Sequence, residues 1–381
     1  MCGGKLGDIY GRKKLFIASL LMFAIGSLAV GFSVNATMII SFRALQGIGS
    51  AILQPTCLAI ITDTFEGEEL QKVIGYYAAV IGAGAVVGIA FGGVCATFIS
   101  WRVGFLINGP LALIMIIIAV KVLKNSEKKV GKLDWFGTIL SVLAMGSITY
   151  GIASKEYTAL ILLISAGLWI VFIISQVRVV EPMMPLFIFK SKERFGAYVG
   201  SLLFSAAGVV FWFYIPQFMQ RQMNFNAFAS AMGMIPMSIL LFAMALRAQK
   251  FSNKLGNNVV MIIGLGLVFI SAIGLSILNA TTNYWFIFPF TLTFGAGFAL
   301  ALTPLTSAAM AKITIDHRGA ASGVYNTTRQ FGAALGLAWG LSVTTGITKI
   351  SSIFQNVMVL AAGLTAIGIV FVSILVLKKR D

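Results

Sequence analysis

Long apolar stretches alternate with short polar ones along the whole chain. Each apolar run is bounded by charged residues, glycine or asparagine. About 20 apolar residues in one helix are needed to cross the hydrocarbon core of a bilayer, so runs of this length predict membrane spans. Twelve spanning helices are expected, at about residues 15–34, 37–62, 73–98, 103–122, 135–153, 158–177, 195–218, 228–246, 258–278, 284–310, 319–345 and 356–377.

Composition supports this prediction. Of the 381 residues, 59% are apolar and only 10% are charged, whereas soluble domains carry about 25% charge. The 40 glycines suit helices that pack closely within lipid. The sequence therefore predicts an all-α polytopic membrane protein and excludes a soluble globule.

The net charge of +16 would suggest a nucleic-acid partner if the basic residues formed one soluble surface. Instead, most of the 28 Lys and Arg residues fall in loops on one side of the predicted membrane. The loops on the other side contain only Arg102, Lys155, Arg221 and Lys349. Basic loops favour the cytoplasm, so we expect both termini to be cytoplasmic, a plasma-membrane location, and no nucleic-acid partner.

An internal repeat relates the third span to the eleventh at one constant offset. The matched pairs are Gly75 and Gly323, Tyr77 and Tyr325, Gly84 and Gly332, Gly88 and Gly336, and Gly92 and Gly340. The repeat predicts an N-terminal half at 1–125, two inserted helices at 126–194, and a C-terminal half at 195–381. Spans seven and eight have no partner in the first half. We therefore expect a complete parent of fourteen spans, whose first two helices this chain lacks.

Residues 4–13, just before the first span, read Gly-Lys-Leu-Gly-Asp-Ile-Tyr-Gly-Arg-Lys. They match every defining position of the G-x-L-x-D-x-x-G-R-[KR] loop of the major facilitator superfamily, so the chain resembles that family. The resemblance implies a gating loop on the cytoplasmic face, with a generic basic turn as the alternative. Its candidate residues are Gly4, Asp8, Gly11, Arg12 and Lys13. We expect Asp8 to cap the following helix or to pair with an arginine.

Two more stretches resemble motifs of the same family. Residues 43–47 fit R-x-x-Q-G, and the third span has the glycine spacing of an antiporter motif, with Ile89 where the family has proline. The motif glycines are Gly75, Gly84, Gly88, Gly92 and Gly93. Four-residue spacing places three of them on one stripe, which predicts close packing against another span. Ordinary helix packing is an alternative explanation.

Other residues resemble the fourteen-span drug:proton antiporter branch of the family. They are Trp101 and Arg102, the stretch 134–137, and Gly323, Asn326, Arg329 and Gln330 in the eleventh span. Arg43 and Arg329 fall within spans, where a guanidinium is costly and is usually functional. Arg43, Gln46 and Arg329 are therefore our candidates for proton coupling. Arg43 could instead reach the nearby outer interface.

The resemblance also implies a central cavity, lined here by spans two, seven and ten. Candidate lining residues are Gln54, Phe204, Phe211, Tyr214, Gln217 and Thr303. Aromatic side chains on an open wall would attract lipophilic cations. Aromatic residues at this spacing can equally face lipid or the helix core.

Together these features predict a secondary transporter that exports amphipathic or cationic drugs by alternating access, driven by protons. Its expected partners are a small-molecule substrate, protons and the bilayer, and we expect a monomer. The sequence has no Walker loop, and His317 is its only histidine. We therefore expect no enzyme activity, no cofactor and no metal.

Proton coupling is the weakest step, because all twelve acidic residues lie in loops or near span ends. The alternative hypothesis is an N-terminally truncated membrane protein without transport activity, or a wrongly assigned start.

Overall fold

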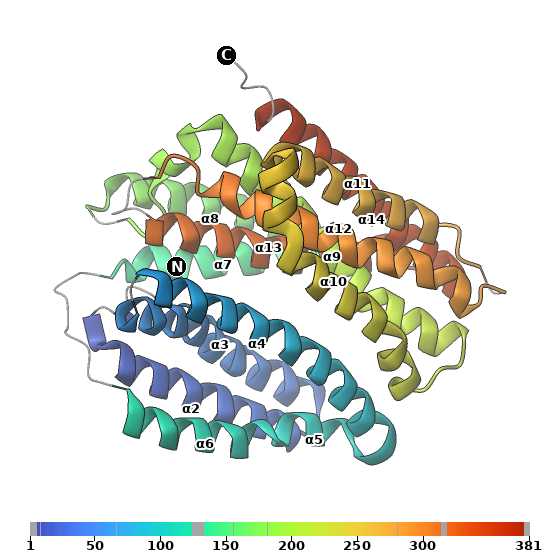
Figure 1. The fold of residues 1–381 in the computed structure, drawn as a ribbon, viewed down its shortest axis with the longest axis horizontal. Helices are drawn as coiled ribbons and strands as arrows, with labels where there is room; N and C mark the ends of the chain where they lie inside the picture. Colours follow the sequence, from blue (N-terminus) through green and yellow to red (C-terminus); the bar gives the residue numbers. More distant parts are fainter. Residues whose placement is uncertain are drawn as a thin grey trace. The chain divides into compact units, whose positions relative to one another are not determined.

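The computed structural model describes residues 6–7, 9–65, 67–123, 133–154, 156–180, 182–279, 281–313 and 318–376 (Figure 1). These residues form helices and connecting turns, with no strand among them, which confirms the all-α prediction. The first helices are α2 (Arg12–Gly31), α3 (Ala36–Thr64), α4 (Gly67–Val94), α5 (Trp101–Leu106), α6 (Asn108–Val122), α7 (Trp135–Ala153) and α8 (Thr158–Arg178). They are followed by α9 (Lys192–Gln222), α10 (Ala227–Leu255), α11 (Asn257–Leu275), α12 (Tyr284–Ala309), α13 (Arg318–Thr344) and α14 (Ile350–Leu375).

Each of the twelve predicted spans coincides with one helix, or with the consecutive pair α5 and α6. Ten of them, within the described residues, are long and apolar enough to cross a membrane. Helices α4 and α13 are outside these ten. A short π-helix, Cys95–Ile99, continues α4, and a 3₁₀ helix, Leu186–Lys190, precedes α9.

The chain divides into two compact units. The N-terminal bundle comprises residues 1–133 and 226–232, and the C-terminal bundle comprises 134–225 and 233–381. Helices α7 and α8 belong to the C-terminal bundle, where α7 also contacts α13. The three-part division at residues 125 and 194 remains a prediction from the repeat.

Glycines allow α2 and α3 to cross closely in the N-terminal bundle. A Cβ atom added to Gly26 would lie 2.7 Å from the amide nitrogen of Gln46. One added to Gly49 would lie 2.6 Å from the amide nitrogen of Phe23. Without hydrophobic driving force between helices in lipid, such backbone approach supplies much of the packing energy.

The fourth span is broken at Ile107, between α5 and α6, and a polar cluster satisfies the break. Ser27 of α2 donates its hydroxyl to the carbonyl oxygen of Phe105 at 2.9 Å. Asn108 donates its side-chain amide to the Ser27 oxygen at 2.9 Å. An unsatisfied polar group within lipid would cost several kcal/mol, so the Ser27 oxygen stabilises this junction by accepting the Asn108 amide while its hydroxyl adds a bond to Phe105.

Helix α9 lies at the centre of the C-terminal bundle, and 72% of its 18-residue apolar stretch is buried. The glycines that the repeat identified on α13 pack directly against it. A Cβ at Gly332 would meet the backbone of Leu202, and one at Gly336 would meet the carbonyl oxygen of Ala206. These glycines therefore allow α13 to pack closely against α9.

A buried polar cluster ties α7, α8 and the loop after α8 together. The two carboxylate oxygens of Asp134 accept hydrogen bonds from Gly137 N at 2.7 Å and from Gln176 Nε2 at 2.6 Å. Gln176, only 3% exposed, also accepts a bond from Met184 N at 2.9 Å. Asp134 therefore serves as the N-cap of α7 and anchors α8 at the same time.

Candidate functional site

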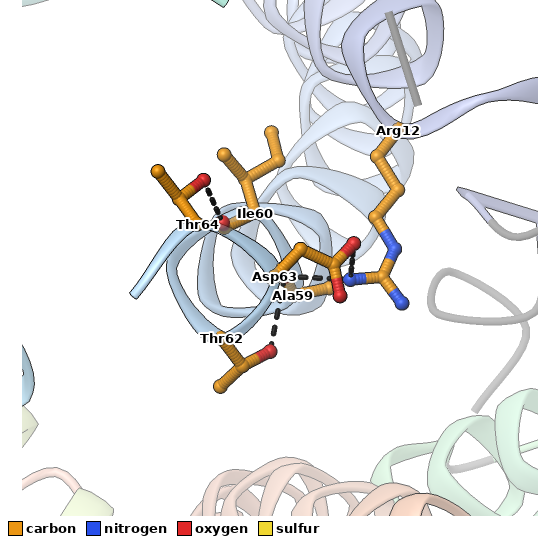
Figure 2. A network of polar contacts seen from close by, with 6 residues as sticks. All are labelled: Arg12, Ala59, Ile60, Thr62, Asp63 and Thr64. Carbon is orange, nitrogen blue, oxygen red and sulfur yellow. Dashed lines mark hydrogen bonds and ion pairs between the residues drawn. The ribbon is translucent and has the colours of Figure 1, made fainter. Parts of the chain in front are cut away.

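Arg12 joins the start of α2 to the end of α3 (Figure 2). Its guanidinium pairs with the carboxylate of Asp63 and donates to the carbonyl oxygen of Ala59 at 2.6 Å. The same carbonyl accepts the hydroxyl of Thr62 at 3.0 Å. The Arg12 side chain is 15% exposed and that of Asp63 is 50% exposed. Water can therefore reach the carboxylate of this pair.

Glycine allows the turn that places Arg12. Gly11 is the N-cap of α2 and has a φ of 92°, a conformation that residues with side chains rarely adopt. The helix thus begins immediately after this glycine, with three cations, Arg12, Lys13 and Lys14, in its first turn.

The next residue, Lys13, caps a third helix. Its ammonium group donates to the carbonyl oxygens of Val120 at 2.8 Å and Leu123 at 2.6 Å. These carbonyls belong to the last turn of α6, where no helical N–H group remains to bind them and where the helix dipole favours a cation. Two consecutive cations therefore hold one end of α2, α3 and α6 together. We call this set, Arg12, Lys13 and Asp63, the basic latch.

The predicted gating loop is only partly described. Arg12 and Lys13 belong to the basic latch and Gly11 precedes them as the N-cap of α2, whereas Gly4 and Asp8 lie outside the described residues. Sequence reasoning offered Asp8 as a partner for the basic residues and did not pair Asp63 with Arg12. The sequence did contain a signal for this pair, because Asp63 follows the second predicted span on the same predicted side of the membrane as the basic loop.

Arg43 and Gln46 are brought together on α3. The Arg43 guanidinium donates to Gln46 Oε1 at 2.7 Å and lies 5.7 Å from the ring centre of Phe105. Gln46 is buried, at 4% exposure, whereas Arg43 is exposed. Gln54 is also exposed, and eleven residues after Arg43 it lies on the same side of the helix. This side of α3 remains a predicted cavity surface.

The glycines of the antiporter-like motif in α4 differ from their copies in α13. A Cβ at Gly84, Gly88 or Gly92 would meet nothing within 4 Å among the described residues. The predicted close packing of this stripe is therefore not present in the described structure. Gly93 does make a close contact, since its Cβ would lie 2.6 Å from that of Ala231. Gly75 lies in the same helix, α4.

The predicted aromatic wall is also corrected. Phe204 and Phe211, on α9, are each 1% exposed and stack on Phe298 and Phe294 of α12. Tyr214 is 7% exposed and packs against Phe354 and Gly340. Burial explains the error, because helix periodicity shows which residues share a face but not what covers that face.

The remaining cavity candidates have a different environment. Gln217 and Thr303 are partly exposed, and Gln217 donates to the carbonyl oxygen of Phe213 at 3.2 Å. Their position on a cavity wall remains a prediction. Within the described residues no group of three or more His, Cys, Asp or Glu side chains could hold a metal ion.

Arg329 lies near the middle of α13 in the C-terminal bundle. Its guanidinium is 5.8 Å from the ring centre of Tyr325, whose hydroxyl is hydrogen-bonded to that of Thr306 at 2.9 Å. Its Nε atom is buried and has no hydrogen-bond partner among the described residues. Arg43 and Arg329 therefore lie in separate bundles with different surroundings.

Comparison with known proteins agrees with these features. Residues 1–337 match the Major Facilitator Superfamily. The chain is 30% identical over 367 residues to Multidrug resistance protein 3 of Bacillus subtilis (strain 168), covering 93% of this chain and 71% of that protein. It is 28% identical over 357 residues to Cephamycin export protein CmcT of Amycolatopsis lactamdurans, covering 90% and 73% of the two chains.

Further similarities point the same way. The chain is 26% identical over 394 residues to Quinolone resistance protein NorB of Staphylococcus aureus (strain Newman), covering 99% of this chain and 84% of that protein. A crystal structure of a POT family transporter in complex with 5-aminolevulinic acid has the same fold, with a TM-score of 0.71 at 15% identity, covering 97% of this chain and 83% of that one.

The chain belongs to the Major Facilitator Superfamily. It is a multi-pass membrane transporter, not an enzyme, and its relatives include multidrug and antibiotic exporters. The resemblance inferred from the motifs is confirmed at the level of the superfamily.

Proposed function

We propose that this transporter exports amphipathic, often cationic compounds from the cytoplasm in exchange for protons, by alternating access. The names of its relatives, which include a multidrug and a quinolone resistance protein, support drug export. Alternating access requires contacts at one end of the helices that break and form again in every cycle.

The basic latch is the observation that carries this proposal. Partly exposed ion pairs contribute only about 0–1 kcal/mol, so thermal energy can break them repeatedly. The Arg12–Asp63 pair nevertheless positions two helix ends through a carboxylate and a carbonyl at once. Such a contact can stabilise one conformation of the transporter and still break when the transporter changes to the other.

Proton coupling requires a group that can lose its proton, which an arginine in a protein does not do. Arg43, Gln46 and Arg329 could therefore only influence a carboxylate. Acids within the described residues lie at helix ends or in loops: Asp63, Glu68, Glu69, Asp134, Glu156 and Glu193. Among them, Asp63 pairs with Arg12 and half of its side chain is exposed, so we propose Asp63 as the acid on which proton coupling depends.

Orientation follows from the charged loops. We propose that the protein resides in the plasma membrane as a monomer with both termini in the cytoplasm, which places the latch on the cytoplasmic side. A reporter fused after Lys379 should be active only if it functions in the cytoplasm. Activity of a periplasm-dependent reporter at that position would contradict this orientation.

Everted membrane vesicles provide the test of coupling. The chain is produced in cells that lack their own drug exporters, and a pH-sensitive dye follows protons after ethidium is added. We expect ethidium to accelerate proton release from energised vesicles. The Asp63→Asn variant should lose this response, whereas Glu156→Gln, which changes an exposed loop acid, should retain it.

Two other outcomes would reject the proposal. Ethidium accumulation without proton movement would reject the exchange of protons for drug. Absence of both, in a correctly folded and inserted protein, would favour the alternative of a membrane protein without transport activity.

A further inference from the structure

Five consecutive polar residues occupy the middle of α13. Residues 326–330 read Asn-Thr-Thr-Arg-Gln, and the helix extends from Arg318 to Thr344. At about 1.5 Å per residue, this run lies well inside a bilayer-spanning helix. Polar side chains at this depth are expensive and usually face a cavity or a ligand.

The two threonines of the run are satisfied within the helix. Thr327 donates to the carbonyl oxygen of Gly323 at 2.8 Å, and Thr328 donates to that of Val324 at 2.9 Å. Asn326 and Gln330 are exposed in the C-terminal bundle. Their spacing of three and four residues puts Asn326, Arg329 and Gln330 along one edge of the helix. Hydrogen bonds within the helix therefore account for the two threonines but not for the polar side chains along this edge.

Arg329 is the costly member of the edge. Its Nε atom is buried without a hydrogen-bond partner, and the described residues place no carboxylate within ion-pair distance of it. The nearby Tyr325 offers its ring, while its hydroxyl is engaged by Thr306. Arg329 as a whole is partly exposed, so the rest of its guanidinium is open to a ligand, and an acceptor for the buried Nε is expected during function.

The helix does not need this arginine for its packing. In the repeat, Ile81 occupies the position in α4 that Arg329 occupies in α13. Contact between α13 and α9 is made by Gly332 and Gly336 instead. On α9, next to the Leu202 that Gly332 meets, the buried hydroxyl of Ser201 also has no partner among the described residues. Both observations point to a polar ligand and not to a structural role.

We propose that Arg329 binds the carboxylate of the transported compound, so that the substrates include amphipathic anions and zwitterions. This inference rests on the proposed export function and names the substrate class for it. The planar guanidinium can offer two parallel N–H groups to a carboxylate. The amide side chains of Asn326 and Gln330, on the same edge, can bind further polar groups of the compound.

Binding measurements on the purified full chain test this directly. The probes are a rhodamine dye with a free carboxylate and the methyl ester of the same dye, followed by fluorescence polarisation in detergent. We expect the wild-type protein to bind the free acid more tightly than the ester. Arg329→Gln should weaken binding of the acid by about tenfold or more and that of the ester by less than about twofold.

Two further variants complete the design. Arg178→Gln removes an exposed arginine at the end of α8 and should change neither affinity. Arg329→Lys should keep part of the preference, because it preserves the charge but not the paired donors. Thermal unfolding checks that each variant is folded, and if Arg329→Gln does not fold, the wild-type preference and the Lys variant still decide the question.

Equal binding of acid and ester by the wild-type protein would overturn the inference, as would an equal loss of both in Arg329→Gln. These results are independent of proton coupling, because binding in detergent requires no gradient. A preference for the acid without drug-dependent proton movement would leave this inference standing and reject the proposed exchange.

Discussion

Arg12, at the start of α2, pairs with Asp63, near the end of α3. The same guanidinium donates to the carbonyl oxygen of Ala59, which lies 47 residues after Arg12 in the chain. The pair closes the same end of the N-terminal bundle at which Lys13 holds α6. Arg12 and Lys13 are consecutive residues of α2, so the ion pair with α3 and the contact with α6 are directly linked. A change at one of these side chains should be felt at all three helix ends.

Neutralising the carboxylate should slow transport more than it weakens the fold. We expect Asp63→Asn to lower the rate of drug export by about fivefold or more, because the latched state loses its charged contact. The free energy of unfolding should change by less than about 1 kcal/mol, since half of the Asp63 side chain is exposed. Export assays in vesicles and thermal unfolding measure the two effects. Partial recovery in the double variant Arg12→Asp, Asp63→Arg would link the loss to the pair.

Two adjacent lysines should behave differently. Lys13 binds the last carbonyls of α6, whereas Lys14 is exposed. We expect Lys13→Met to increase hydrogen exchange at the end of α6, since its final turn loses its cap. Lys14→Met removes the same charge from the same turn of α2 and should leave this exchange unchanged. Equal effects would mean that charge alone matters, and not the cap.

The two copies of the glycine stripe offer a matched pair of substitutions. Gly336→Ala places a methyl group against the backbone of Ala206, and we expect it to destabilise the protein by about 1–3 kcal/mol. Gly88→Ala meets open space, and alanine is favoured over glycine in helices, so stability should be unchanged or slightly higher. Thermal unfolding in detergent compares them. Similar losses in both variants would show that α4 packs closely through this stripe in the membrane.

Removal of Gln176 should destabilise the C-terminal bundle. Gln176→Ala leaves one oxygen of Asp134 and the amide of Met184 without their partner, at a cost of about 1–3 kcal/mol. The control, Gln249→Ala, breaks an exposed hydrogen bond to Asn253 and should have little effect. Both are measured as changes in thermal unfolding. A neutral Gln176→Ala variant would show that water replaces the buried amide.

The helices were predictable because lipid imposes a single length and a single chemistry on each span. Each of the twelve predicted ranges is largely helical where it is described, although residues 32–34 and 276–278 lie beyond the ends of their helices. The repeat could not show that Gly332, Gly336 and Gly340 of α13 have α9 against them while Gly84, Gly88 and Gly92 of α4 meet nothing among the described residues, because packing depends on the neighbouring helix and not on the stripe. Likewise, Phe211 belongs to a periodic aromatic face, but its stacking on Phe294 required knowledge of the tertiary fold.

The candidate site was predicted in part for a related reason. The basic loop before α2 was recognisable from local spacing, whereas Asp63 and the α6 carbonyls that complete the latch come from distant residues. Sequence reasoning identified Arg43 and Arg329 from the cost of placing a guanidinium in a membrane. It could not distinguish Arg43, which has Gln46 as a partner, from Arg329, whose Nε has none among the described residues.

The polar cluster at the break between α5 and α6 constrains how this transporter can evolve. Ser27 serves the carbonyl of Phe105 and the amide of Asn108 simultaneously, so neither position is free to change alone. A lineage that lost the Ser27 hydroxyl would leave the side-chain amide of Asn108 without its acceptor, unless another acceptor lay at the same depth. Among relatives, residues at positions 27 and 108 should therefore vary together, although 81 positions separate them in the chain.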